Sequence, residues 1–523
     1  MTDQAVKSNS SLTKWMYPAI LLVSFFILYN KVFDEKLDLN GDNAAYFVHG
    51  KGIAEGAGYV KYNTLAQKPA NHYPIGYPVI IGLTMKVFGD DIVTVKRANG
   101  FFLLSFTVLF FFLIKHITKN DLLAFSTALL CLLNSHLLRY STIMMSEVPY
   151  LLFSIVTVYY LIQSDWEQSP FKNRNFLTML LFLGVTYYIR TAGVALFGGI
   201  LLYLLFKKKW TYSGVLFGGF AIFPILWKMR GNMAGLEGSS YMKQLLRVNP
   251  YRAELGQAGI GDFITRFWNN FERYITVEIP NGIFPFMDRP QIDRESGEMM
   301  LEMGDWILGI LIIALVLFGL KKLSKYGDLL FFYLLGTFGI LMLWPDVWTG
   351  PRFLISILPI LIFLLFFGLW NLANLGLEKA GSKGQIPAWS LLIFTLFYFK
   401  PIGELEEQAD ANYPAQWKNY FALADYVKQN TNKETTVVAC RKPELFYVFA
   451  NRYTIRYKDT PEVSELIAKL DEQSVTHVAF APYLGYGSEQ RYLAPALQSS
   501  PQLFPTVQQF KNPDTWLLKY ARN

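Results

Sequence analysis

The sequence predicts a polytopic α-helical membrane protein with about eleven transmembrane helices, interfacial helices in the first outer loop and a small C-terminal α/β domain. Of the 523 residues, 52% are hydrophobic and 16% are aromatic. The mean hydropathy of +0.25 exceeds what the core of a soluble protein of this length requires. Apolar runs recur as far as residue 400, and beyond it short strand and helix patterns alternate.

The predicted spans are apolar runs, judged against the roughly 20 residues that a helix needs to cross the hydrocarbon, with about 17 to 25 tolerated. The first span follows only Lys7 and Lys14 and lacks a small-residue cleavage pattern, so we expect a retained anchor. Residues 1–400 are therefore predicted to form the transmembrane domain. Its spans lie near 16–33, 98–117, 121–137, 148–163, 175–190, 192–206, 211–228, 305–320, 327–343, 352–372 and 388–400.

Lysine and arginine residues are concentrated in every second loop between these spans. Because positive residues are retained on the cytoplasmic side, we expect a cytoplasmic N-terminus and an outer C-terminal domain. We therefore attribute the formal charge of +8 to the cytoplasmic loops that set the orientation of the protein in the membrane. We expect no nucleic-acid partner. The loops expected on the outer side are 34–97, 138–147, 229–304 and 344–351.

The first outer loop, 34–97, carries Asp42 in an Asn-Gly-Asp-Asn turn. Segment 43–54 is weakly amphipathic, and 75–88 is apolar but too short to span, so both are predicted to be helices that lie in the interface. Asp42 stands at the start of the first of these helices. Helix capping is therefore an alternative explanation for its carboxylate.

Residues 401–523 are predicted to form an extracytoplasmic α/β domain. The domain has no glycine-rich phosphate loop, and its one histidine, His477, lies in a predicted strand. We therefore expect a binding or packing module. The predicted helices are 415–430 and 461–472, and the predicted strands are 435–439, 453–457, 475–480 and 515–520.

Charged side chains at membrane depth are costly, so they are candidates for function. Guanidinium groups bind phosphate through two parallel hydrogen bonds, so several arginines near one face suit an anionic lipid head group. The alternative is that they extend to the interface or pair with carboxylates between helices. The charged residues predicted near the outer ends of spans are Asp42, Arg139, Glu147, Arg190, Asp346 and Arg352.

Short motifs with these residues follow one another as Asn40-Gly-Asp-Asn-Ala-Ala-Tyr46, His72-Tyr-Pro-Ile-Gly-Tyr-Pro78, Arg139-Tyr-Ser141, Ser146-Glu-Val-Pro-Tyr150, Tyr188-Ile-Arg-Thr-Ala-Gly193 and Gly350-Pro-Arg-Phe-Leu354. In order and spacing they resemble the GT-C membrane glycosyltransferases. These are the polyprenyl-phosphate-sugar users related to protein O-mannosyltransferases and lipid A aminoarabinose transferases. The resemblance covers most of residues 15–400, and 401–523 resembles the outer domains of bacterial members. It implies a location in the bacterial inner membrane.

Two positions depart from the family pattern. Asn43 follows the loop aspartate where the family often has an acidic residue, and Tyr73-Pro74 stands where Pro-Pro is common. These departures leave the donor sugar open, together with the use of a divalent cation. No cofactor is assigned.

The resemblance implies an inverting transfer of a sugar from a polyprenyl-phosphate donor to a hydroxyl of a lipid, glycan or protein. Polyprenyl phosphate is already a good leaving group, so one carboxylate suffices, in contrast to the two of glycoside hydrolases. Asp42 would accept the proton of the acceptor hydroxyl. Arg190 and Arg352, together with Arg139, would stabilise the charge on the departing phosphate.

Four further residues are assigned by the same resemblance. Glu147 either contacts the sugar or acceptor, or is a buried partner of an arginine. His72 and Tyr73 would line the entrance for the donor or acceptor, and Lys68 is a further candidate for the phosphate.

Two other classes of protein share some of these features. A transporter or flippase of a lipid-linked or anionic substrate also has many spans and intramembrane charges, but it usually shows related halves with broken helices near the midplane. No such repeat is visible here. A non-catalytic scaffold or sensor built around the outer domain is the other class.

Overall fold

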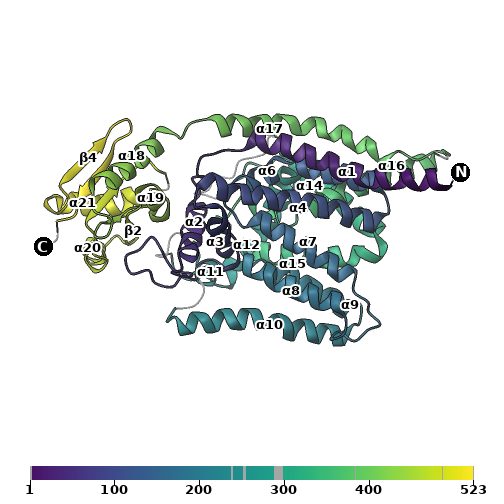
Figure 1. Cartoon of the computed structure of the whole chain (residues 1–523), viewed down its shortest axis with the longest axis horizontal. Helices are drawn as coiled ribbons and strands as arrows, with labels where there is room; N and C mark the ends of the chain where they lie inside the picture. Colours follow the sequence, from purple (N-terminus) through teal and green to yellow (C-terminus); the bar gives the residue numbers. More distant parts are fainter. Residues whose placement is uncertain are drawn as a thin grey trace. The chain divides into compact units, whose positions relative to one another are not determined.

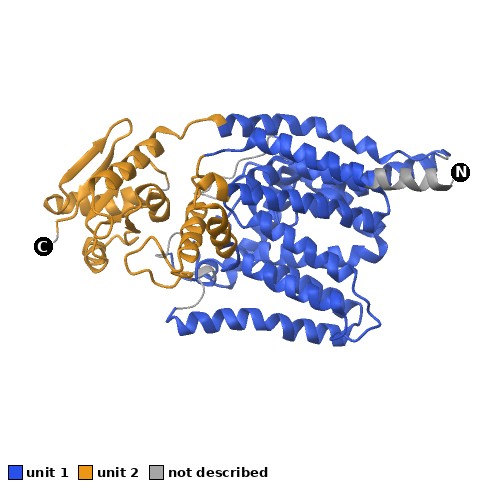
Figure 2. Ribbon diagram, viewed as in Figure 1, with its two compact units in different colours: residues 1–35, 71–77, 96–409 blue, residues 36–70, 78–95, 410–523 orange. Residues whose placement is uncertain are grey.

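The computed structural model describes residues 3–236, 240–250, 255–287, 299–382, 384–485 and 487–521. They form two compact units, coloured separately in Figure 2. Unit 1 comprises residues 1–35, 71–77 and 96–409, and unit 2 comprises 36–70, 78–95 and 410–523. Most of the predicted first outer loop therefore packs in the same unit as the C-terminal segment. The boundary at residue 400 between two domains stays a prediction.

Unit 1 is helical (Figure 1). Its α-helices are α1 (Asp3–Val32), most of α4 (Ile92–Thr118), α5 (Asp121–Leu133), α6 (Ser135–Ser141), α7 (Glu147–Ile162), α8 (Arg174–Ile189), α9 (Gly193–Phe206), α10 (Trp210–Met233), α11 (Ser240–Leu245), α12 (Ile260–Arg273), α13 (Ile279–Ile283), α14 (Met303–Lys322), α15 (Gly327–Leu343), α16 (Leu358–Lys379) and α17 (Thr395–Asp410). Short π or 3-10 turns join them at η2 (Tyr274–Glu278), η3 (Ser324–Tyr326), η4 (Pro351–Leu354) and η5 (Ala388–Phe394).

Six helices in the described ranges are long and apolar enough to cross a membrane, and the bent pair α5 and α6 adds a seventh candidate. The helices α7 and α9 are apolar but shorter. The chain is therefore a multi-pass membrane protein, as predicted, while the number of about eleven spans stays a prediction. The predicted loop 229–304 contains α11, α12, η2 and α13, and its residues 237–239, 251–254 and 288–298 lie outside the described ranges.

The predicted span 121–137 is broken at Asn134, where α5 and α6 meet at 64°. Asn134 ends α5 with extended backbone angles and caps α6, because its side-chain oxygen accepts the N–H groups of His136 and Leu137. Its side-chain NH₂ donates to the carbonyl oxygen of Gly282 at 2.8 Å. A cap in the middle of an apolar run therefore bends the span.

Pairs of helices in unit 1 pack closely where glycine leaves room for a neighbouring backbone. The helices α9 and α15 are one such pair, and α14 and α16 are another. A Cβ atom on Gly336 of α15 would lie 2.6 Å from the carbonyl oxygen of Ala195 in α9. Small residues serve this purpose in membranes because close packing, rather than the hydrophobic effect, holds such helices together.

Unit 2 contains a five-stranded sheet with the order β2-β1-β3-β5-β4, in which β1 is parallel to β2 and β3, and β5 is antiparallel to β3 and β4. The predicted α/β domain is thus confirmed. The edge strand β4 was not predicted because its TVQQF sequence is polar and largely exposed. The elements are α2 (Gly41–Ala54), most of α3 (Gly76–Phe88), α18 (Ala415–Asn430), β1 (Val437–Ala439), α19 (Pro443–Ala450), β2 (Tyr453–Ile455), α20 (Val463–Glu472), β3 (His477–Phe480), η6 (Glu489–Leu493), α21 (Ala494–Ser499), η7 (Pro501–Leu503), β4 (Thr506–Phe510) and β5 (Thr515–Lys519).

The two helices predicted in the first outer loop are present as α2 and α3. Within unit 2, α2 packs against α19, a helix that sequence periodicity did not predict. The Tyr413 hydroxyl donates to the Leu37 carbonyl oxygen at 2.9 Å, and the N–H of Thr454 donates to the Asn63 carbonyl oxygen at 2.7 Å. The C-terminal segment therefore supports the loop that carries Asp42.

Candidate active site

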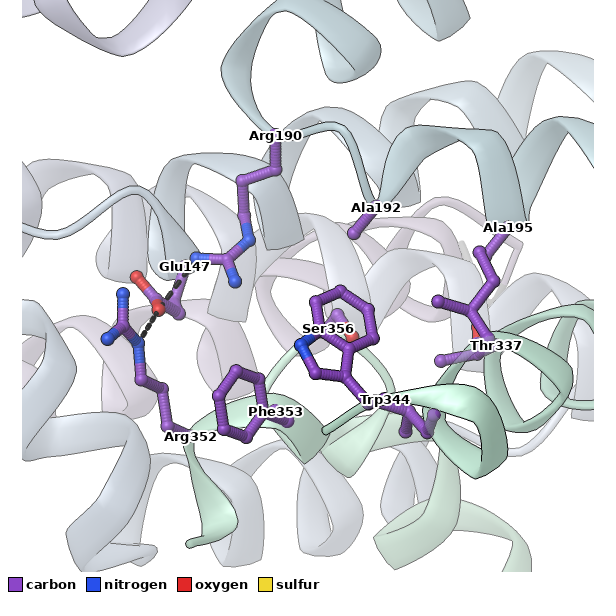
Figure 3. A pocket seen from close by; sticks show the side chains of 11 residues that line it. Glu147, Arg190, Ala192, Ala195, Thr337, Trp344, Arg352, Phe353 and Ser356 are labelled. Carbon is purple, nitrogen blue, oxygen red and sulfur yellow. Dashed lines mark hydrogen bonds and ion pairs between the residues drawn. The ribbon is translucent and has the colours of Figure 1, made fainter. Parts of the chain in front are cut away.

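One buried carboxylate in unit 1 holds two arginines at the edge of a small cavity (Figure 3). The Oε1 atom of Glu147 lies 2.6 Å from Nη1 of Arg190 and 2.6 Å from Nε of Arg352. The Glu147 side chain is only 2% exposed, and the arginine side chains are 18% and 21% exposed. Two guanidinium groups on one carboxylate leave a net charge of +1, so the cluster suits an anionic ligand.

Three breaks in helical structure bring these side chains together. Glu147 is the first residue of α7, and Arg190 ends α8 with extended backbone angles of φ −146 and ψ 135. Arg352 is the second residue of η4, a turn that begins directly after Gly350. The φ of +108 at Gly350 is a backbone conformation that favours glycine. Ser146 supports Arg190, because its Oγ accepts a hydrogen bond from Arg190 Nη1 at 3.1 Å.

The turn that precedes Arg352 is fixed by residues of the predicted outer loop 229–304. The Glu278 carboxylate accepts the backbone N–H of Gly350 at 2.7 Å, and Arg273 donates to the carbonyl oxygen of Asp346. Asn270 donates to the carbonyl oxygens of Met342 and Trp344. Sequence reasoning did not single out Arg273, Glu278 or Asn270, since one polar loop contains many such residues and no spacing distinguishes these three.

Aromatic and small residues line the rest of the cavity, which has a volume of about 30 Å³. This volume is large enough to hold water-sized groups. The indole N–H of Trp344 is buried, and among the described residues it has no hydrogen-bond partner. The same holds for Oε2 of Glu147. The other lining residues are Ala192, Ala195, Thr337, Ile340, Leu341, Phe353 and Ser356.

The other predicted site residues in unit 1 lie outside this cavity lining. His72 and Tyr73 precede α3, with their rings edge to face and 4.4 Å apart, and Tyr73 is buried. Arg139 is exposed in the last turn of α6. The structure thus brings together Glu147, Arg190 and Arg352 but does not add Arg139 to their cavity.

Asp42 and Lys68 belong to unit 2. Asp42 is the second residue of α2, and the N-cap is Asn40, whose side-chain oxygen accepts the N–H of Asp42 at 3.3 Å. Asn40 is therefore the residue that caps α2, and Asp42 lies in the first turn of the helix. Lys68 is exposed, and its carbonyl oxygen accepts the N–H of Lys61.

Within the described ranges, no group of three or more His, Cys, Asp or Glu side chains is arranged to hold a metal ion. No residues are therefore assigned to a divalent cation.

Comparisons with known proteins show which fold the chain has. Residues 72–227 match the family model described as dolichyl-phosphate-mannose-protein mannosyltransferase. The chain has the fold of the GT-C membrane glycosyltransferases, which confirms the resemblance seen in the sequence motifs.

Particular solved structures are similar over nearly the whole chain. ArnT from Cupriavidus metallidurans bound to undecaprenyl phosphate has a TM-score of 0.59 at 11% identity, covering 98% of this chain and 99% of that one. Its apo state has a TM-score of 0.56 at 10% identity, covering 98% of each chain. The Archaeoglobus fulgidus oligosaccharyltransferase, in complex with Zn and sulfate, has a TM-score of 0.55 at 11% identity, and the match covers 95% of this chain and 72% of that one. No curated protein matches the sequence.

Proposed function

We propose that this protein is an inverting glycosyltransferase that moves a sugar from a polyprenyl-phosphate donor to an acceptor hydroxyl. The reaction takes place at the outer face of a bacterial inner membrane, with the N-terminus cytoplasmic and the C-terminal domain periplasmic. The observation that carries the proposal is the pair Arg190 and Arg352, held by the single buried carboxylate of Glu147 beside a cavity.

The arginine pair suits the phosphate of such a donor. Each guanidinium presents its N–H donors in a planar fork, a geometry that matches the oxygens of a phosphate group. The buried indole N–H of Trp344, which has no partner among the described residues, adds a neutral donor at the same cavity. Donors fixed in advance around a departing phosphate stabilise its growing charge without reorganisation. The similar fold of an ArnT structure that contains undecaprenyl phosphate supports this ligand class.

The reaction is a single displacement. The acceptor oxygen attacks the anomeric carbon, the bond from that carbon to the phosphate oxygen breaks, and polyprenyl phosphate leaves. Asp42 takes the proton of the acceptor hydroxyl as general base. One displacement inverts the anomeric configuration.

Glu147 is assigned to the arginines. Its Oε1 contacts both guanidinium groups, and its side chain is 2% exposed. These observations favour a buried partner over a direct contact with the sugar or acceptor. His72 and Tyr73 are proposed to line the substrate entrance, and Arg139 and Lys68 remain proposed phosphate contacts outside the cavity.

Mass spectrometry of lipid that copurifies with the detergent-solubilised protein tests the donor class. A glycosylated polyprenyl phosphate is expected, whereas a bound lipid phosphate without any sugar would favour a transporter or flippase. The Asp42→Asn variant should retain the bound lipid and lose sugar transfer to acceptors in a membrane extract. Full transfer by this variant would overturn the assignment of the base.

A further inference from the structure

The C-terminal segment of unit 2 places a lysine against the first residues of α2. Lys442 precedes α19, and its Nζ lies 3.3 Å from the position that a Cβ on Gly41 would occupy. The Cδ atom of the same side chain lies 3.7 Å from that position. Since Gly41 is followed directly by Asp42, the ammonium group of Lys442 lies at the helix turn that carries the proposed base.

The backbone of Lys442 is held in place. Its carbonyl oxygen accepts the N–H of Phe446 at 2.9 Å, as expected at the start of α19. The Tyr420 hydroxyl lies 3.4 Å from the Lys442 nitrogen and 3.5 Å from its carbonyl oxygen. Tyr420 is fully buried in unit 2. Because the backbone of Lys442 is fixed beside the start of α2, the positions that the lysine side chain can reach are limited.

Charged groups surround this ammonium. Burial lowers the pKa of Lys442, the neighbouring charge of Arg441 lowers it further, and the Asp42 carboxylate raises it. Arg456 lowers the same pKa and Glu444 raises it, each by less than Asp42 does. Of these two carboxylates, Asp42 therefore has the larger effect on the pKa of Lys442. At the start of α2, the Asp38 carboxylate accepts hydrogen bonds from the backbone N–H of Asn40 and from the side-chain NH₂ group of Asn43.

We infer that Lys442 is a positioning residue that keeps the Asp42 carboxylate ionised and oriented, so that the C-terminal segment of unit 2 acts on the proposed base. The inference rests on the proposed function, in which Asp42 is the general base. An ammonium close to a carboxylate favours its charged form, and only the charged form can accept a proton. It also gives the C-terminal domain a role in the reaction beyond packing.

Titration of Asp42 in the full-length, detergent-solubilised protein tests the inference without any substrate. The carboxyl band is assigned from the infrared difference between wild type and Asp42→Asn. In Lys442→Met the titration midpoint should rise by about one pH unit, and in Lys442→Arg it should stay near that of wild type. Lys433→Met, the same substitution at an exposed site of unit 2, should leave it unchanged. An unchanged midpoint in a folded Lys442→Met protein would overturn the inference.

The pH dependence of sugar transfer is the second measurement, with polyprenyl-phosphate mannose as the donor probe and a membrane extract as the source of acceptor. The acidic limb of kcat should move upward by the same amount in Lys442→Met, and Lys442→Arg should restore it. A purely structural lysine would lower the amount of folded protein without moving this limb, and that result counts against the inference. If wild type transfers no sugar from any lipid-linked donor, the proposed function fails, while the titration still decides whether Lys442 acts on Asp42.

Discussion

The carboxylate of Glu278 accepts a hydrogen bond from the backbone N–H of Gly350, with 2.7 Å between the two atoms. This bond joins η2 to the turn that leads into η4, two residues before Arg352. Glu278 is 2% exposed, so water does not compete for the contact. The position of one arginine in the cavity therefore depends on a residue of a different segment.

Removing this acceptor should disturb Arg352. We expect Glu278→Ala to lower kcat/KM for sugar transfer by about 100-fold, because a displacement of the order of 1 Å in a catalytic group can have that effect. Glu278→Gln keeps a carbonyl acceptor for the Gly350 N–H and should retain most of the activity. Equal losses in both variants would mean that the charge of Glu278, and not this hydrogen bond, is what matters.

Glu147 should be essential for the stability of the arginine cluster. Removing one member of a buried ion pair leaves uncompensated charge, at a cost of about 3 to 5 kcal/mol, so Glu147→Ala should unfold at a clearly lower temperature than wild type. Glu147→Gln removes the charge but keeps the volume of the side chain. Its unfolding temperature should therefore lie between those of Glu147→Ala and wild type. A ligand phosphate would offset the excess positive charge, so added polyprenyl phosphate should raise the unfolding temperature of Glu147→Gln more than that of wild type. An unfolding temperature of Glu147→Ala equal to that of wild type would contradict the prediction.

The two arginines of the cavity should be more sensitive to substitution than an arginine exposed elsewhere in unit 1, such as Arg174. Lysine has the charge but not the planar fork of arginine, so Arg352→Lys and Arg190→Lys should each lower kcat by about 10- to 100-fold. Arg174→Lys, at the exposed start of α8, is the matched control and should change kcat by less than threefold. The kinetics of purified protein decide the comparison, and equal losses at Arg174 and in the cavity would contradict the prediction.

Burial of Glu489 makes unit 2 sensitive to pH. Burial raises the pKa of Glu489 from 4.5 to about 7, against the hydrogen bond from Ala481 and the charge of Arg441. The folded state thus binds the proton more tightly than the unfolded state does. The contribution of Glu489 to stability is therefore greatest below pH 4.5, falls as the pH rises to about 7 and then levels off, with a total loss of about 3 kcal/mol.

Hydrogen exchange of the strand β3, corrected for intrinsic rates, measures this pH dependence. Glu489→Gln should remove most of the loss of protection between pH 5 and about 8 that wild type shows. Glu434→Gln, at an exposed position in unit 2, should behave like wild type. A wild-type protein with constant protection over this range would show that the pKa of Glu489 is not raised in the folded state.

Asn43 should resist replacement by the acidic residue that is common at this position in the resembling family. It is fully buried, its NH₂ group donates to the Asp38 carboxylate at 3.2 Å, and its Oδ1 has no partner among the residues that the structure describes. Asn43→Asp would place two carboxylates together, so we expect a loss of about 3 kcal/mol in the free energy of unfolding of unit 2. Exchange rates in α2 report the loss, with the exposed Asn430→Asp as control. Unchanged exchange in α2 would contradict the prediction.

Local signals were sufficient for much of the fold. Runs of apolar residues predicted the helices of unit 1, because hydropathy acts along a single segment. Alternation of strand and helix patterns predicted the C-terminal domain. The cap at Asn134 was missed, since it lies inside an apolar run and its partner Gly282 is distant in sequence. The helix α19 was also missed, because eight residues carry little periodic signal.

For the candidate site, too, the sequence predicted some features and missed others. The order of the motifs was enough to pick out Asp42, Glu147, Arg190 and Arg352 as candidates in a membrane protein of this kind. Three contacts became visible only after folding: Glu147 binds both arginines, Glu278 holds the turn before Arg352, and Lys442 lies beside the helix of Asp42. These contacts join residues 43 to about 400 positions apart, and no local pattern encodes which distant partners meet once helices and strands have packed.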